Sequence, residues 1–269
     1  MNIYLKGWKL LGSLSKVFAI LIFYTGISLF AQDSNENNAS QIQSLLLQQP
    51  AVWVGQDSVF LKENNQSYQR ASQGINKLDN ESYFLSMREN SLAVWIYQGS
   101  SVRALGENLF DITPNRISIE KGALLTDNRA GNDMTFSGFA VNLEISGKGL
   151  FILQGTVNGG LKFIALAGRF TLNQPVKGIK KVKLYPGQLA FAQPERKGFS
   201  KILNFNLKTL IASSGLINEF DNEPSFDREL SKAVIEQEGL ITEEFRAKVG
   251  DAYEASTFDI EKIPEKKDP

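Results

Sequence analysis

The middle of the chain alternates short apolar stretches with turn-forming residues. From Val52 to about Ala192, glycine, asparagine or proline-glycine positions recur at intervals of roughly 8–12 residues. Several stretches between them place an apolar side chain at every second position, which gives a β-strand one apolar face. Clear examples are Ile117 and Ile119, and Val141, Leu143 and Ile145. The pattern predicts an all-β domain over residues 52–192, with many short strands stacked as a β-roll, a solenoid or a sandwich.

Two nearly continuous apolar runs predict the centre of this domain. They cover residues 149–154 (GLFILQ) and 161–166 (LKFIAL), and they flank Asn158-Gly159, a dipeptide favoured in tight hairpin turns. Strands that are apolar on both faces are typical of positions between two packed layers. We therefore expect these runs to form a hairpin of innermost strands. Gly147 and Gly168 are among the glycines that we expect in turns between strands.

The stretch 92–97 also has apolar side chains on both faces of its expected strand. This pattern favours packing of Trp95 and Tyr97 between two layers of a core. Aromatic rings at a surface also stack on sugar rings or on a protein partner. For this reason Trp53 and Tyr97 are candidate partner-binding residues.

Helical periodicity replaces the strand pattern in the C-terminal segment, residues 193–250. Asn206 is placed to cap a first helix that carries apolar residues at helical spacing. A second helix is expected between Pro224 and Gly239, and a third between Thr242 and Gly250. Residues 251–269 are expected to form a mobile charged tail.

The N-terminal 31 residues have the features of a secretory signal peptide. Three lysines precede or border an uncharged apolar run, Val17–Phe30, and Ala31 is a small residue suited to cleavage. The run has 14 residues, fewer than the roughly 20 that a membrane-spanning helix needs. Cleavage is favoured and leaves no stable membrane span, while retention of the run as an anchor is the alternative. A polar linker with a short helix is expected over residues 32–51.

The composition removes several kinds of chemistry. The 269 residues include no Cys and no His, so thiolate or imidazole catalysis, Cys/His metal sites and disulfides are excluded. The formal net charge is zero and becomes slightly negative without the lysines of the signal peptide, so a nucleic-acid partner is not expected. We expect no enzyme activity, no cofactor and no metal. A glycoside hydrolase that uses two carboxylates, Glu107 with Asp111 or Asp127 with Asp133, remains a minor alternative.

A small basic patch lies near the end of the expected β domain. It contains Lys177 and the three lysines Lys180, Lys181 and Lys183. Such a patch suits lipid phosphates or an acidic polysaccharide. Lysines on an outer strand also prevent unwanted strand pairing, which is the favoured interpretation. The three lysines are kept as candidate partner-binding residues.

The order of several segments resembles the FecR-like domain of bacterial envelope proteins. The similarity spans about Val52 to Ile217, and its segments are ISIEKGALLT (117–126), FAVNLEISGKGLFILQGTVNGGLKFIALAGRFTL (139–172), KLYPGQLAFAQP (183–194) and FNLKTLIASSGLI (205–217). The first resembles a strand–Gly–strand step of the family, the second its central stack of strands, and the third its closing segment. The fourth resembles a helix that follows the domain in exported members.

The resemblance implies an extracytoplasmic β domain that relays a signal from an outer-membrane receptor to a regulator of a sigma factor. Only 16 residues precede the apolar run, too few for the folded cytoplasmic domain of sigma-regulating members. We expect a non-enzymatic scaffold or signalling domain that binds a partner protein of the cell envelope. Its expected location is the periplasm, the outer envelope or the exterior of a bacterium. The alternative is a module that binds envelope polysaccharide.

Overall fold

Strands dominate the structure, as the alternating pattern predicts. The computed structural model describes residues 50–56, 58–63, 66–194, 198–220, 226–240, 245–249 and 258–262, which belong to one compact unit of the chain. The expected signal peptide and almost all of the expected linker lie outside the described residues. Within the described part, the expected class is confirmed: a curled sheet of many strands followed by short C-terminal helices.

The elements are short, apart from two strands. The β domain contains β1 (Ala51–Gln56), β2 (Val59–Glu63), β3 (Gln69–Arg70), β4 (Gly74–Lys77), β5 (Tyr83–Met87), β6 (Leu92–Tyr97), β7 (Ser100–Leu105), β8 (Asn108–Thr113), β9 (Arg116–Lys121), β10 (Ala123–Asn128), β11 (Met134–Ser137), β12 (Asn142–Gly155), β13 (Leu161–Asn173), β14 (Val182–Leu184) and β15 (Gln188–Ala192). The C-terminal part adds β16 (Leu203–Phe205), α2 (Leu207–Ser213), α3 (Gly215–Asn218), α4 (Asp227–Leu240), β17 (Phe245–Val249) and β18 (Phe258–Lys262).

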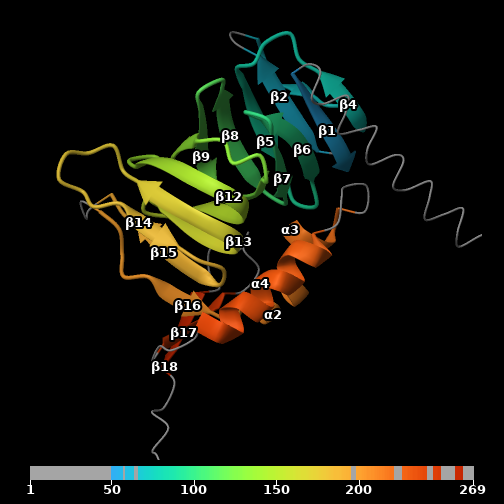
Figure 1. The fold of residues 1–269 in the computed structure, drawn as a ribbon. Helices are drawn as coiled ribbons and strands as arrows, with labels where there is room; N and C mark the ends of the chain where they lie inside the picture. The colour runs from blue at the N-terminus through green and yellow to red at the C-terminus, as the bar shows by residue number, and fades with distance from the viewer. Residues whose placement is uncertain are drawn as a thin grey trace, which may run out of the picture. The chain divides into compact units, whose positions relative to one another are not determined.

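The strands form two arms that meet at the long strand β12 (Figure 1). In the first arm β4, β1, β6, β7 and β10 are neighbours in that order, and β10 pairs with the C-terminal half of β12. In the second arm the order is β3, β2, β5, β8, β9 and β11, and β11 pairs with the N-terminal half of β12. Strand β13 pairs with the other edge of β12. On its far side β13 pairs with β14 and β15, and β15 pairs with β16.

The two arms face each other across an aromatic core. The ring of Trp95 in β6 lies 5.7 Å from that of Phe110 in β8, measured between centroids. The rings of Tyr97 in β6 and Phe136 in β11 are 6.2 Å apart. Each pair joins one arm to the other. Trp95 is completely buried, which confirms the prediction that it packs in a core.

Strands β12 and β13 form the hairpin predicted around Asn158-Gly159, and they are the innermost strands. Their side chains over 150–153 and 163–166 are buried on both faces. On the face toward the two arms, Phe151 stacks on Phe163 with 5.0 Å between ring centroids. A hairpin packed from both sides is a rigid base for the turn at its end.

Gly147 and Gly168, expected in turns, lie inside β12 and β13 instead. Their φ angles are 135° and 91°, and the register between the two strands shifts between Leu150 and Phe151. A Cβ atom on Gly168 would lie 2.0 Å from the carbonyl oxygen of Lys148. Turns and bulged strands both need glycine at such positions, so the sequence does not distinguish between them.

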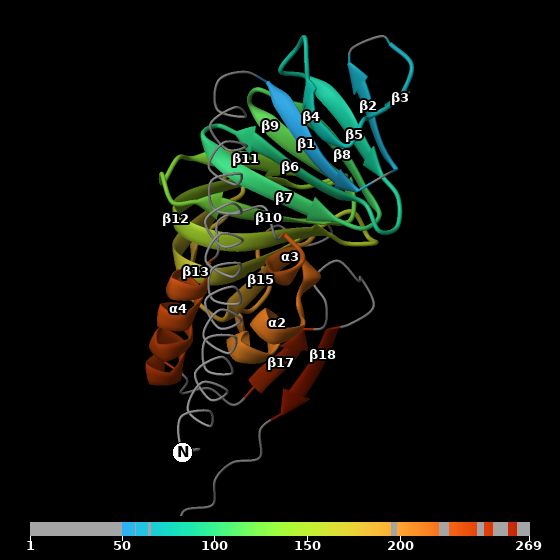
Figure 2. The same cartoon turned by 90° about the vertical axis from the view of Figure 1, so that its right-hand side faces the viewer.

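The helices cover the sheet face opposite the aromatic core (Figure 2). Helix α3 contacts β7 and β10, and α4 contacts β13. Most of the buried side chains on the two sides of this contact are apolar: Leu125, Leu150, Ile152, Ile164 and Leu166 from the strands, and Leu207, Leu210, Leu216, Phe220, Phe226 and Leu230 from the helices and their flanks. The exception is the buried Arg103 of β7, whose guanidinium lies 4.1 Å from the ring centroid of Phe226. The protein therefore has a second apolar core. No helix in the described part of the chain is long and apolar enough to cross a membrane.

The first two predicted helices are confirmed, and the third is wrong. At the start of α2, Asn206 Oδ1 accepts a hydrogen bond from the backbone N–H of Thr209 at 3.1 Å, and α4 corresponds to the second helix. In place of the helix expected between Thr242 and Gly250, residues 245–249 form β17, which pairs with β16 and β18. The sequences FRAKV and FDIEK alternate apolar and charged residues, which is the period of a strand. Part of the expected mobile tail is therefore strand β18.

Candidate functional site

The two aromatic candidate residues lie in or against the body of the β domain. Tyr97 has an exposed fraction of 4%, its hydroxyl donates to the carbonyl of Thr135 at 3.5 Å, and burial raises its pKa. Trp53 in β1 is half-buried, and its ring lies so close to Gly55 that a Cβ atom there would be 2.6 Å from it. Neither residue lines the two cavities described below. Tyr97 thus lacks the open ring face that a binding role requires.

The three candidate lysines are exposed and close together in sequence. Lys183 belongs to β14, opposite Thr171 of β13, and Lys180 and Lys181 precede that strand. Strand β13 is separated from β6 and β1 by β12, β10 and β7 in the order of pairing. The lysines therefore do not form one site with the aromatic candidates.

The candidate acid pairs have different environments. Asp127 is buried and holds the guanidinium of Arg129 at 2.6 Å, which raises the pKa of Arg129. Arg129 also reaches Glu229 of α4 at 3.3 Å, so Asp127 helps to fix the helix layer. Asp133 is exposed. Among the described residues, no group of three or more acidic side chains is arranged to hold a metal ion.

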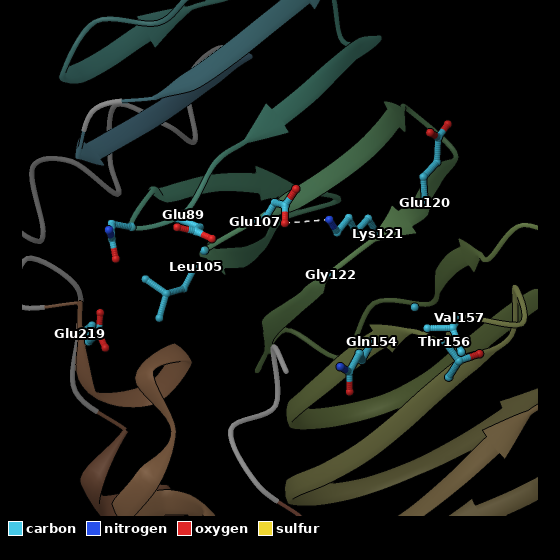
Figure 3. Close-up of a pocket in the computed structure, with 13 residues that line it drawn as sticks. Glu89, Leu105, Glu107, Glu120, Lys121, Gly122, Gln154, Thr156, Val157 and Glu219 are labelled. Carbon is cyan, nitrogen blue, oxygen red and sulfur yellow. Dashed lines mark ion pairs between the residues drawn. The ribbon is translucent and has the colours of Figure 1, made fainter. Parts of the chain in front are cut away.

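A cavity of about 700 Å³ opens where several turns meet at one end of the sheet (Figure 3). It is lined by the turn before β6, the β7–β8 and β9–β10 turns, the end of β12 with its hairpin turn, and the segment after α3. Its polar and charged lining residues are Glu89, Asn90, Glu107, Glu120, Lys121, Gln154, Thr156 and Glu219. We call it the acidic cavity, because four glutamates and one lysine line it.

The charges of the acidic cavity are unbalanced. Lys121 Nζ lies 2.7 Å from Glu107 Oε2, and Figure 3 shows this pair on one side of the cavity. More than half of each side chain is exposed, so water screens this pair. Glu89, Glu120 and Glu219 have no ion-pair partner within the described part of the chain. Three negative charges thus remain uncompensated beside one neutralised pair.

Gln154, at the end of β12, holds a buried amide oxygen beside the acidic cavity. Its exposed fraction is 2%, and its Oε1 has no hydrogen-bond partner among the described residues. A buried polar atom without a partner costs about 1–3 kcal/mol. Opposite Gln154 in the register lies Lys162, whose pKa burial lowers to about 8.

Two strongly exposed apolar side chains lie beside the acidic cavity. Val157, in the hairpin turn, is 97% exposed, and Phe139, in the turn between β11 and β12, is 89% exposed. The two turns are joined by a hydrogen bond from Ala140 N–H to Gly159 O at 3.2 Å. Glu120 lines both the acidic cavity and a second cavity of about 380 Å³ that Phe139 borders. We call Val157, Phe139 and the acidic cavity together the hairpin-tip surface.

The sequence predicted only part of the hairpin-tip surface. Glu107 stands out as a candidate acid, but its partner in the structure is Lys121 and not Asp111. The signal of this surface in the sequence is a glutamate close to a turn residue, which recurs in Glu89-Asn90, Gly106-Glu107 and Glu120-Lys121-Gly122. Turns at the same end of a sheet bring such residues together.

Comparisons with known proteins leave the family open. No family model matches the sequence, and no curated protein matches it. Two crystal structures of a "putative anti-sigma factor" from Parabacteroides distasonis ATCC 8503 align with this chain at TM-scores of 0.37 and 0.38. Each alignment has 10% sequence identity and covers 67% of this chain and 99% of the other. Similarity at this level establishes neither a shared family nor a shared function.

Proposed function

We propose that this chain is a non-enzymatic, extracytoplasmic contact domain that binds a partner protein of the bacterial cell envelope. The observation that carries the proposal is the hairpin-tip surface, where Val157 and Phe139 are 97% and 89% exposed on two hydrogen-bonded turns. Single exposed apolar residues are common, but neighbouring ones next to a polar cavity are typical of interaction sites.

The hairpin-tip surface is held by a rigid base. The hairpin strands are buried on both faces over residues 150–153 and 163–166, and β12 pairs with β10, β11 and β13. A surface that is already ordered loses little conformational entropy on binding. The partner is a protein segment with basic and apolar side chains, because the acidic cavity attracts positive charge and the exposed side chains attract apolar groups.

Location and partner class rest on the sequence. The apolar run Val17–Phe30 after three lysines supports export. The resemblance to FecR-like domains supports a contact or signalling role in the envelope. The resemblance does not extend to a partner's identity, so the chemistry of the hairpin-tip surface defines the partner.

Polysaccharide binding has less support than protein binding. Tyr97 is buried, and the ring of Trp53 lies against Gly55. The exposed Lys180, Lys181 and Lys183 remain available to an acidic polymer. Lysines at such positions also fit protection of a short outer strand, so they do not favour a sugar ligand.

Site-specific photocrosslinking in native envelopes tests the proposal. A benzoylphenylalanine at position 157 is compared with one at position 235, because Ile235 is 71% exposed on α4 and lines neither cavity. We expect position 157, and not 235, to form a crosslink whose contact peptide carries basic and apolar residues. Introduction of Phe139→Asp into the same chain should remove the crosslink. The proposal is wrong if positions 157 and 235 give the same products, or if 157 gives none.

A further inference from the structure

We infer that the second cavity, which Phe139 borders, binds a neutral sugar unit whose pyranose ring stacks on the phenyl ring of Phe139. We call this space of about 380 Å³ the Phe139 cavity. This ligand goes beyond the proposed function, because it occupies the outer face of the second arm, opposite the aromatic core. The cavity shares no residue with Trp53, Tyr97 or the three candidate lysines, on which the polysaccharide alternative rested.

The floor of the Phe139 cavity contains a row of three polar side chains on neighbouring strands. Ser137 of β11 lies opposite Ser118 of β9 and opposite Asn142 of β12 in the strand register, and all three line the cavity. Their neighbours along the three strands belong to the aromatic core. Because side chains alternate between the two faces of a sheet, the polar row faces outward. Neighbouring strands are about 4.8 Å apart, so one small ligand reaches all three side chains.

Ser137 places an unused hydroxyl group at the centre of this row. Its exposed fraction is 5%, and its side chain makes no hydrogen bond within the described part of the chain. The hydroxyl oxygen is open to the cavity, unlike those of Ser101 and Ser214, which are fully enclosed. Buried hydroxyl groups normally pair with another polar group. A ligand in the cavity is therefore the partner left for Ser137.

The charged side chains beside the row favour a ligand with hydroxyl groups. Arg116 and Glu120 lie on β9 on either side of Ser118, each about 6–7 Å away along the strand. Neither has an ion-pair partner among the described residues. A guanidinium only donates hydrogen bonds and a carboxylate only accepts them, whereas hydroxyl groups do both and satisfy each of them. One cation and one anion together give no preference for a charged ligand.

Phe139 supplies an apolar face beside these polar groups. Its side chain is 89% exposed, although turns usually hold small or polar residues. One face of a pyranose ring presents C–H groups, which pack on an aromatic ring while the hydroxyl groups at the rim make hydrogen bonds. The exposed ring and the polar row together match the two kinds of surface that a sugar has.

The turn that carries Phe139 is held in place by the hairpin turn between β12 and β13. Gly138 approaches the hairpin turn so closely that a Cβ atom on it would lie 2.8 Å from the carbonyl oxygen of Gly159. The N–H of Ala140 donates to the same oxygen at 3.2 Å. A site that is ordered before binding loses little conformational entropy, which matters for a ligand as small as one sugar unit.

Saturation-transfer NMR on the full-length chain tests the inference. The probes are the methyl pyranosides of glucose, galactose, mannose and N-acetylglucosamine. Sorbitol is the control, because it has hydroxyl groups but no ring with a flat apolar face. We expect transfer to the C–H groups on one face of at least one glycoside and none to sorbitol.

Three results would overturn the inference. The first is the absence of transfer to every glycoside, and the second is equal transfer to sorbitol. The third is a preference for methyl glucuronide over methyl glucoside, which would indicate a site for an anion and not for a neutral sugar.

Variants locate the bound sugar. Phe139→Ala removes the exposed ring and should weaken binding of the glycoside about tenfold, and Ser137→Ala should weaken it several-fold. Val157→Ala truncates an exposed side chain that borders the acidic cavity and not the Phe139 cavity, so it should leave the affinity unchanged. All three variants should keep the unfolding temperature of the parent chain. Equal losses of affinity in F139A and V157A would place the binding elsewhere and overturn the inference.

The sugar site and the proposed function fail in different ways. If a glycoside binds and no crosslink forms at position 157, the sugar site stands and the protein contact is wrong. If position 157 crosslinks to a protein and no glycoside binds, the contact surface stands and the sugar site is wrong, because the ring of Phe139 then serves the protein partner.

Discussion

At the scale of single residues, burial of Lys162 makes the free energy of unfolding change with pH in the alkaline range. Its exposed fraction is 5%, and burial lowers its pKa from 10.5 to about 8. At a pH between these two pKa values, Lys162 holds its proton in the unfolded chain and has released it in the folded chain. Stability therefore rises as the pH increases through this window, and the cost of the buried charge is fully present below pH 8.

Lys162→Met should stabilise the protein at neutral pH. Removal of the buried charge is expected to raise the free energy of unfolding by roughly 2–3 kcal/mol at pH 7, with most of that gain gone near pH 10.5. Urea denaturation at a series of pH values measures it. Lys183→Met, on the exposed side of β14, is the control and should change little. An equal gain at both ends of the pH range would show that the charge of Lys162 is not the cause.

Two glycines with similar backbone angles should respond very differently to alanine. Gly168 and Gly178 have φ of 91° and 90°. A Cβ atom on Gly168 would meet the Lys148 carbonyl oxygen at 2.0 Å, whereas Gly178 has open space around it. We expect Gly168→Ala to cost more than about 3 kcal/mol and Gly178→Ala about 1 kcal/mol. Thermal unfolding measures the loss of stability in each variant. Similar losses would mean that crowding around Gly168 does not contribute to the cost.

At the scale of elements, one buried amide joins the helix layer to the sheet at several points. Gln237 of α4 is 6% exposed. Its Nε2 donates to the carbonyl oxygens of Phe205 and Gly187, and its Oε1 accepts the N–H of Leu207 at 3.1 Å. One side chain thus joins α4 to the end of β16, the start of α2 and the turn before β15.

Gln237→Leu should loosen α4 without changing the β domain. The substitution leaves buried backbone groups without partners, which is expected to cost roughly 3 kcal/mol. Hydrogen exchange should increase in α2 and α4 and stay unchanged in β12 and β13. Glu238→Gln, at the neighbouring exposed position, is the control. Uniform acceleration across all elements would mean that helices and sheet unfold as one unit.

The sequence was most informative about elements with one regular period. The alternation around Ile117 and the dipeptide Asn158-Gly159 sufficed for strands and for the central hairpin, because local sterics and burial determine both. Gly168 was misplaced because a bulge and a turn need the same residue. The strand Phe245–Val249 was taken for a helix because its pairing with β16 is not a local property. Glu219 joined the acidic cavity only through the packing of α3, which no local pattern encodes.

At the scale of the whole molecule, two apolar cores share the same strands. The aromatic core lies between the arms, and the helices cover the opposite face of β7, β10 and β13. Leu150, Ile152, Ile164 and Leu166 on that face are completely buried. The helices are therefore needed to keep this apolar face from water.

A chain that ends at Phe205 should aggregate, because it lacks the helices that cover Leu150 and Ile164. A chain that ends at Leu240 keeps this cover and should remain monodisperse. Size-exclusion chromatography with a dye that binds exposed apolar surface compares the two. Monodisperse, dye-negative behaviour of the shorter chain would show that the β domain is complete without its helices.

The anchoring of the central hairpin has a mechanical consequence. A partner that pulls on Val157 along the strand direction loads the bonds from β12 to β10 and from β13 to β15 simultaneously, since these bonds lie across the direction of pull. Tension applied at the tip is then shared among many bonds instead of opening them one after another. The hairpin is thus arranged to transmit a pull at its tip into the body of the protein.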